Sequence, residues 1–177
     1  NCGGGLDIYS LTDPAAPEAI GCASGEGYTH DAQCVTYNGP DTDHTGKQIC
    51  FGYNVNRVAI VDVTNPAAPQ TISNAFYPNP GYTHQGWLTE DGRHIIVNDE
   101  GDENFGQATR TMVIDVQDLD SPEFDFIYTH DTNTVDHNLY THNGYAFEAN
   151  YNHGLRILDL ANIDSDQLSL VAQFDTF

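Results

Sequence analysis

Positive charge is almost absent from this chain of 177 residues, which has five Lys and Arg side chains against 26 Asp and Glu. The formal net charge of −21 leaves no basic stripe to neutralise phosphates, so nucleic-acid binding is not predicted and docking on an anionic bilayer is disfavoured. No apolar run reaches 18 residues, so this segment is not predicted to insert into a membrane. The acidity is typical either of a solvated surface, as in salty surroundings, or of divalent-cation binding.

Catalytic sequence motifs are also lacking. The chain has no GxSxG elbow, no HExxH pair and no Walker loop, so the usual nucleophile, metalloprotease and nucleotide sites are not predicted. Met and Trp occur once each, whereas ten Tyr and eight Phe accompany many β-branched residues. This bias favours pleated sheet, and no segment has a helical period with caps.

Cysteine is scarce and never occurs in a CxxC spacing, which argues against a zinc ribbon or a thioredoxin-type motif. The four cysteines Cys2, Cys22, Cys34 and Cys50 allow three pairings. We favour Cys34–Cys50, because these two lie on adjacent apolar runs joined by the turn-rich segment 38–41. Cys2–Cys22 would then brace the first half-unit. Disulfides predict an oxidising compartment, and the alternative is a reduced cytosolic protein.

A repeated apolar run organises the chain. LDIYSLTDP at residues 6–14 and VAIVDVTNP at 58–66 are each followed by Ala-Ala-Pro. TMVIDV at 111–116 and LRILDL at 155–160 continue the series, at offsets of 52, about 53 and about 44 residues. Each run predicts a strand that ends near an Asp and is usually followed by a Pro-bearing turn.

A second marker keeps the same period. His30, His84 and His137 each open an apolar or alternating run, at offsets of 54 and 53 residues. Two markers in one register indicate an internal repeat of about 53 residues.

Each full unit contains four strand candidates bounded by Gly, Asn, Asp and Pro, as is typical of a β-propeller blade. We therefore predict an all-β fold of 14 antiparallel strands in about three and a half blades. The half blade is 1–29, and the blades are 30–79, 80–132 and 133–177. Their predicted strands are 31–37, 48–54, 57–64 and 70–77, then 85–89, 94–99, 110–116 and 124–129, then 138–142, 145–150, 155–160 and 168–174.

Three and a half blades do not close a ring, and an open array would leave apolar faces and strand edges in water. We expect the remaining blades to come from more of the same chain or from a second copy.

The strands VAIVDV and LRILDL resemble those of LVIVD-repeat propellers. Longer runs resemble the choice-of-anchor B group, in the expected order over almost the whole chain; they are residues 27–34, 38–41, 81–88, 136–140 and 154–159. The resemblance implies a bacterial protein that is secreted or attached to the cell surface, with the periplasm as the alternative compartment. It also implies a propeller larger than this segment, and it implies no known reaction or substrate.

The repeated histidines are the first candidate site. The first strand of each propeller blade lines the central channel, so His30, His84 and His137 are expected to converge at one mouth. Three imidazoles together suit zinc, copper or another borderline metal. The residues that follow them would orient the rings; these are Asp31, Gln85 and Asn138. The alternative is a structural role, in which each histidine caps an inner strand by hydrogen bonding to the neighbouring blade.

A second candidate is the acidic sequence NDEGDEN at residues 98–104, between the second and third strands of the second blade. Its carboxylates repel one another unless they are solvated or bridged by a cation. The sequence therefore predicts a calcium site at Asp99, Glu100, Asp102 and Glu103, or else a solvated acidic loop.

A repeat scaffold without an assembled catalytic motif favours a non-catalytic extracellular module. We expect it to bind a protein or surface partner, or to assemble at the cell surface, with a divalent metal (Ca, Zn or Cu) as a stabilising ligand. Enzyme activity is left open, because the alternative is a metalloenzyme whose centre on the propeller axis is held by His30, His84 and His137.

Overall fold

The computed structural model describes residues 2–176 as β-strands joined by turns and short 3-10 segments. The half blade contains β1 (Leu6–Ser10) and β2 (Glu18–Ala23). The full sheets contain β3 (Asp31–Thr36), β4 (Gln48–Tyr53), β5 (Val58–Asp62) and β6 (Gln70–Ala75); β7 (Thr83–Leu88), β8 (His94–Asp99), β9 (Arg110–Asp115) and β10 (Glu123–Thr129); and β11 (Asn138–His142), β12 (Tyr145–Ala149), β13 (Leu155–Asp159) and β14 (Ser169–Phe174). The 3-10 segments are η1 (Thr42–His44), η2 (Asp102–Phe105), η3 (Tyr151–His153) and η4 (Ile163–Ser165).

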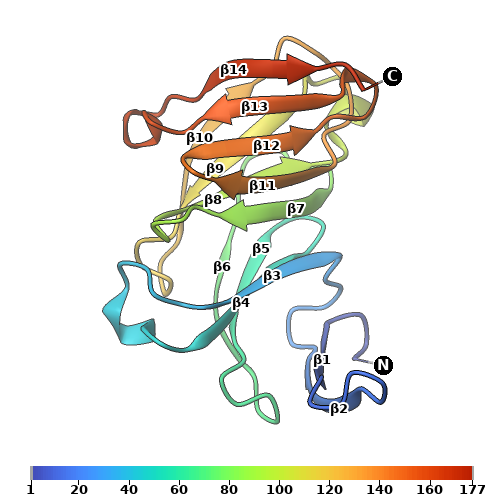
Figure 1. Cartoon of the computed structure of the whole chain (residues 1–177), viewed down its shortest axis with the longest axis vertical. Helices are drawn as coiled ribbons and strands as arrows, with labels where there is room; N and C mark the ends of the chain where they lie inside the picture. The colour runs from blue at the N-terminus through green and yellow to red at the C-terminus, as the bar shows by residue number, and fades with distance from the viewer. Residues whose placement is uncertain (1, 177) are drawn as a thin grey trace.

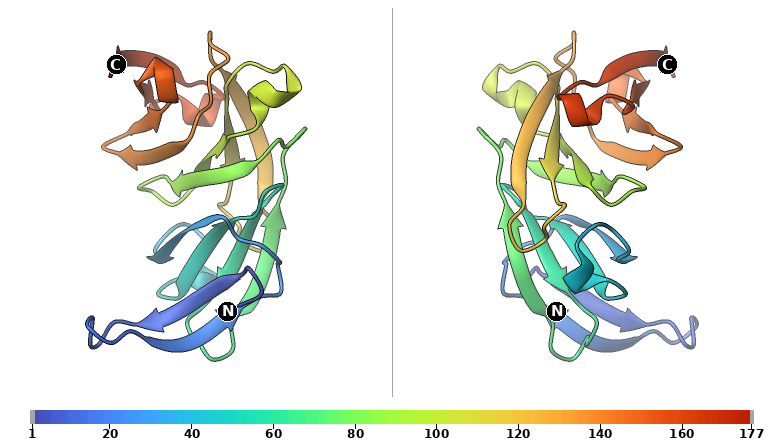
Figure 2. Two further views of the ribbon diagram at one scale, coloured as in Figure 1. Left: turned by 90° about the vertical axis from the view of Figure 1, so that its right-hand side faces the viewer. Right: turned by 90° about the vertical axis from the view of Figure 1, so that its left-hand side faces the viewer.

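Each sheet is an antiparallel meander in which the strand order follows the chain. The two-stranded sheet and the three four-stranded sheets succeed one another through the molecule (Figure 1, Figure 2). The predicted all-β architecture of four-stranded antiparallel sheets is confirmed, and the predicted strands of the three full sheets begin and end within two residues of the observed ones. No helix in the described part of the chain is long and apolar enough to cross a membrane.

The Asp at the end of each repeated strand turns the chain. In β5, β9 and β13 its carboxylate accepts a hydrogen bond from the backbone N–H two residues later, at 2.9, 2.8 and 2.8 Å. These residues are Asp62, Asp115 and Asp159. In β1 the equivalent residue is Ser10, whose hydroxyl accepts from the Thr12 N–H. Such side-chain hydrogen bonds mimic a backbone turn, which explains why a short polar residue recurs at this point of the repeat.

A register shift marks the pairing of the last two strands in every sheet. It occurs in β5–β6, β9–β10 and β13–β14, and again in β1–β2. A bulge of this kind increases the local twist of a strand pair. The β1–β2 hairpin therefore has the form of the third and fourth strands of a blade.

The second sheet is buried on both faces. In β8, Ile95 and Val97 join a core shared with the first sheet, whereas Ile96 between them joins a core shared with the third. In β9, Met112 joins the core shared with the first sheet, and Val113 joins the core shared with the third. Because side chains alternate along a strand, a sheet packed on both faces needs continuous apolar runs rather than alternation with polar residues.

The first strands of neighbouring sheets are linked by side chains. Gln85 in β7 accepts a hydrogen bond from the Leu139 N–H of β11 at 2.7 Å and donates to the Leu139 carbonyl at 3.0 Å. Gln33 in β3 accepts from the Leu88 N–H of β7 at 2.7 Å. At these points, side chains supply partners to backbone groups of the inner strands, which none of the described strands pairs with along that edge.

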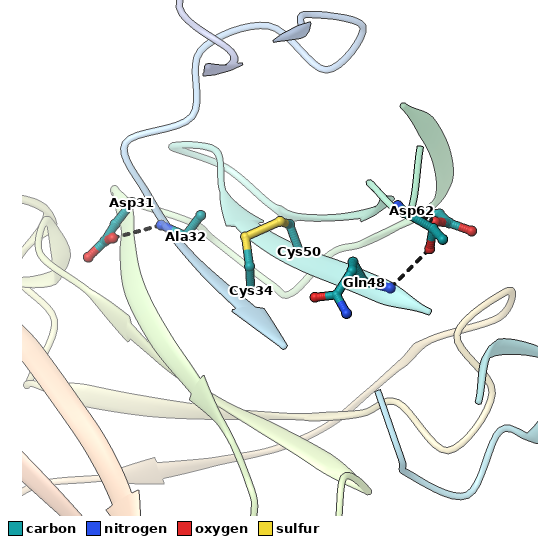
Figure 3. The surroundings of a disulfide bond; sticks show 7 residues. Asp31, Ala32, Cys34, Gln48, Cys50 and Asp62 are labelled. Carbon is teal, nitrogen blue, oxygen red and sulfur yellow. Dashed lines mark hydrogen bonds between the residues drawn. A yellow bond between two sulfur atoms is a disulfide. The ribbon is translucent and has the colours of Figure 1, made fainter. Parts of the chain in front are cut away.

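Both predicted disulfides are confirmed. Cys34 in β3 and Cys50 in β4 are opposite each other in the strand register, with Cα atoms 4.0 Å apart (Figure 3). Cys2 and Cys22 join the start of the half blade to β2, with Cα atoms 5.4 Å apart. Each bond thus holds a short loop within one sheet, of the kind that an oxidising compartment preserves.

Candidate binding site at the ends of the inner strands

Three imidazoles lie in a row where the inner strands begin. His84 is the second residue of β7, whereas His30 and His137 immediately precede β3 and β11. The ring centroids of His30 and His84 are 4.3 Å apart, and those of His84 and His137 are 4.4 Å apart. We call these three residues the imidazole row. Equivalent positions on neighbouring sheets bring together side chains that are more than 50 residues apart in the sequence.

Glu100, the residue after β8, adds a carboxylate to the row. Its Oε2 lies 3.5 Å from His84 Nε2, and its Oε1 lies 3.5 Å from His137 Nε2. Burial lowers the pKa of His84; Glu100 opposes this, whereas the neighbouring His137 and His30 lower the pKa further. The net decrease favours the neutral His84 ring at physiological pH, in which one nitrogen carries a free lone pair.

Tyrosine hydroxyls surround the row. Those of Tyr28 and Tyr82 lie 3.1 and 3.0 Å from His30 Nδ1, and the Tyr151 hydroxyl donates to Glu100 Oε1 at 3.4 Å. The candidate site predicted from the sequence does not include these tyrosines. Tyr28 and Tyr82 belong to two copies of the sequence GYTH, which was the available signal, whereas Tyr151 lies in η3 without a repeated motif.

The residues that follow the histidines differ in what they contact. The Asn138 carboxamide lies 2.9 Å from His137 Nδ1, so the predicted contact is confirmed there. Asp31 accepts instead from the backbone N–H of the next residue, and Gln85 bridges to β11. The prediction that these two orient histidines is wrong, because their polar groups bond to the Ala32 N–H and to the Leu139 backbone instead.

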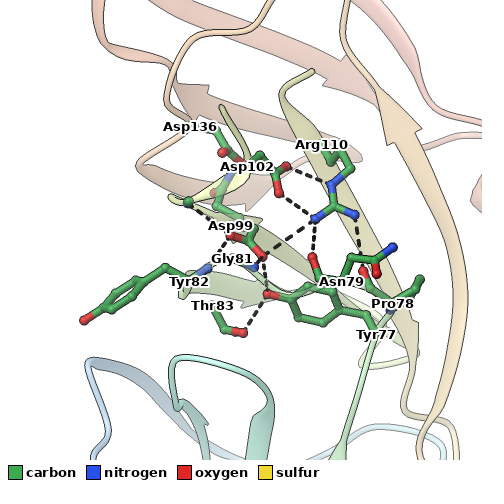
Figure 4. A network of polar contacts seen from close by, with 12 residues as sticks. Tyr77, Pro78, Asn79, Gly81, Tyr82, Thr83, Asp99, Asp102, Arg110 and Asp136 are labelled. Carbon is green, nitrogen blue, oxygen red and sulfur yellow. Dashed lines mark hydrogen bonds and ion pairs between the residues drawn. The ribbon is translucent and has the colours of Figure 1, made fainter. Parts of the chain in front are cut away.

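Asp99, the last residue of β8, is fully buried and surrounded by donors (Figure 4). Its carboxylate accepts hydrogen bonds from the backbone N–H groups of residues 81, 82 and 101 and from the Tyr77 hydroxyl. Asp102 in η2 forms a bidentate ion pair with Arg110, with N–O distances of 2.6 and 3.0 Å (Figure 4). These donors give both buried carboxylates hydrogen-bond partners, although burial still raises the pKa of Asp102 to about 6.

The four carboxylates of the predicted calcium loop therefore have different surroundings. Asp99 and Asp102 face backbone amides and Arg110, whereas Glu100 faces the imidazole row. Glu103 lines a hollow that Glu100 also borders. A calcium ion shared by all four would have to displace the Arg110 guanidinium, and such a site stays a prediction.

An open hollow of about 470 Å³ lies beside Glu100. We call it the acidic hollow; its lining residues are Gly81, Tyr82, Glu100, Gly101, Glu103, Asn104, Val135 and Tyr151. Among the described residues, no Lys or Arg lines it, and Glu103 Oε2 is buried without a hydrogen-bond partner. Two phenol rings and two carboxylates around one hollow offer cation–π and ion-pair contacts to a positively charged group.

The fold defines the class of this protein as a β-propeller. The chain is similar to the crystal structure of the Cps50 (Swd1) beta-propeller domain of Myceliophteria thermophila, with a TM-score of 0.60 at 14% sequence identity. The match covers 98% of this chain and 54% of that one, so this chain spans about half the length of that propeller. At this identity the likeness concerns the fold alone. No family model matches the chain, and no curated protein matches it.

Proposed function

We propose that the chain is a segment of an extracellular, non-catalytic β-propeller that binds a basic segment of a protein or surface partner in the acidic hollow. The observation that carries this proposal is the lining of the hollow, where Tyr82 and Tyr151 accompany Glu100 and Glu103. The net charge of −21 would attract a basic partner over a distance and accelerate its encounter.

The second part of the proposal concerns the cellular location of the protein and its relation to known propeller families. The two disulfides support an oxidising environment. The resemblance of the repeated strands to LVIVD-repeat propellers, and of the longer runs to the choice-of-anchor B group, supports a bacterial protein that is secreted or held at the cell surface. The blades that close the ring would come from the same chain or from a second copy, in keeping with the match to about half of a solved propeller.

The binding proposal is tested with labelled peptides and the 177-residue protein. We expect a Lys- and Arg-rich peptide to bind saturably, and a peptide with Gln in place of each basic residue not to bind. Affinity should fall as salt is raised, because the attraction is electrostatic. Glu103→Gln and Tyr151→Ala should each weaken binding by about two- to fivefold, the effect of one exposed ion-pair or cation–π contact.

Glu123→Gln is the matched control, since Glu123 is an exposed carboxylate in β10 outside the hollow. It should bind the basic peptide as the unmodified protein does. Equal binding of the Gln peptide, or equal weakening by Glu103→Gln and Glu123→Gln, would show that the hollow is not the binding site.

A further inference from the structure

We propose that His84, His137 and Glu100 form a binding site for one divalent transition metal ion, with zinc as the ion best matched to the donors. This inference goes beyond the binding of a basic partner and does not depend on it. It rests on the side chains at the imidazole row, which come from three separate parts of the chain.

The donor atoms are already close to the spacing that a small metal ion requires. One atom from each of the three side chains lies within 4.8 Å of the other two. The two nitrogen–oxygen distances to Glu100 are both 3.5 Å. Ligand atoms in a tetrahedral zinc site with bonds of about 2.0–2.1 Å are roughly 3.3 Å apart, so small side-chain rotations would complete the site.

The chemistry of the donors selects the ion. Two imidazoles and one carboxylate suit zinc and other borderline metals, whereas calcium and magnesium prefer oxygen ligands alone. The ring of His84 is buried, so its position is fixed by the surrounding side chains. Glu100 supplies negative charge between the two rings.

The surroundings hold the rings in place. The Asn138 carboxamide at 2.9 Å from His137 Nδ1 orients that ring, which leaves Nε2 on the side of Glu100. His30 is adjacent to His84, but its Nδ1 is engaged by the hydroxyls of Tyr28 and Tyr82. Three protein ligands leave one position of a tetrahedral ion open, as in catalytic zinc sites, so metal loading is also the first requirement of the metalloenzyme hypothesis.

A competing cluster contains Asp41, His44 and Asp120, between η1 and the turn before β10. The Lys47 ammonium lies 3.3 Å from His44 Nδ1, and its positive charge disfavours a second cation at that place. This cluster provides an internal comparison for the experiment.

The test is titration of the metal-free 177-residue protein with Zn²⁺ by calorimetry and with Co²⁺ by visible absorption. We expect one ion per chain and the absorption bands of a tetrahedral Co²⁺ complex. His84→Ala and His137→Ala should each lower the affinity at least about 100-fold, at or beyond the upper end of the effects of outer-shell substitutions. Ca²⁺ should not compete at concentrations that saturate with Zn²⁺.

His142→Ala is the matched control, because His142 lies at the far end of β11 and its side chain is 68% exposed. It should leave metal binding unchanged. His137→Ala removes a partly exposed ring and is expected to fold, which circular dichroism would verify. The proposal is overturned if the unmodified protein binds no zinc at millimolar concentration, or if His44→Ala abolishes binding while His84→Ala does not.

The two proposals can fail separately. Glu103→Gln should weaken peptide binding and leave zinc affinity intact, whereas His84→Ala should do the reverse. The two sites share Glu100 but differ in their other residues, so loss of both properties in both variants would contradict the assignment of different roles to Glu103 and His84.

Discussion

Glu26 links the half blade to the first full sheet through a cluster of polar contacts. Arg57 donates to the Glu26 carbonyl at 2.6 Å, and Asn74 donates to Glu26 Oε2 at 2.9 Å. Burial alone would raise the pKa of Glu26, but hydrogen bonds from Asn74 and Thr71 and the Arg57 charge lower it below its usual value. The carboxylate is therefore bound more favourably in the folded protein than in the unfolded chain.

Glu26→Gln should lower the free energy of unfolding at pH 7 by about 1 kcal/mol. Because the folded pKa lies below the unfolded value of about 4.3, this stabilisation is fully present above that pH and is lost as the pH falls through the folded pKa. Denaturant unfolding at pH 7 and pH 3 would measure the difference between the two proteins. The exposed Glu123→Gln is the control, and a difference of equal size at both pH values would contradict the prediction.

At the scale of the strand, the inner edges of the sheets depend on a few side chains. Gln85 provides both a donor and an acceptor to the backbone of Leu139, and all of these groups are buried. Thr141 also donates to the Leu88 carbonyl at 2.7 Å. Neighbouring sheets are thus joined without pairing of their inner strands. Side-chain amide and hydroxyl groups form the hydrogen bonds between them instead.

Gln85→Ala should lower the free energy of unfolding by about 1–3 kcal/mol, because the Leu139 N–H and carbonyl would be buried without these partners. Gln173→Ala in β14 is the matched control, since that glutamine is exposed on a strand. Chemical denaturation would measure the stability, and hydrogen exchange at the Leu139 amide would locate the effect. Equal stability of the two variants would show that the bridge contributes nothing.

At the scale of the whole molecule, negative charge is far from balanced. All five basic side chains, Lys47, Arg57, Arg93, Arg110 and Arg156, already form ion pairs with acidic residues. The remaining Asp and Glu side chains have no Lys or Arg left to neutralise them. Their mutual repulsion destabilises the compact state, although it keeps the protein soluble.

Raising NaCl from 10 to 150 mM should therefore stabilise the protein, because the Debye length falls from about 30 to about 8 Å over this range. We expect a gain of roughly 1 kcal/mol, equivalent to a rise in melting temperature of about 2–4 °C. Calorimetric scans at constant pH would measure it. A melting temperature that stays constant or falls would show that charge repulsion is not limiting.

Local pattern was sufficient for the strands, the turns and both disulfides. Alternation and turn residues act on neighbouring positions, so each strand could be located from its own sequence, and the Asp of VAIVDV marked the end of a strand before a Pro-bearing turn. The turn-rich segment 38–41 between two apolar runs placed Cys34 opposite Cys50 on adjacent strands. The repeat brought His30, His84 and His137 together, because equivalent positions of successive sheets share one end of the inner strands.

Tertiary structure alone decided which partners meet at those positions. Glu100 reaches the imidazole row and Arg110 neutralises Asp102 because the turn after β8 folds back over the strand ends, and the sequence NDEGDEN contains no sign of that direction. Gln85 bridges two sheets instead of orienting His84, because the packing of β7 against β11 places the Leu139 backbone next to its carboxamide. Strand formation depends on neighbours along the chain, whereas the contacts of a side chain depend on how whole sheets pack, which links residues far apart in the sequence.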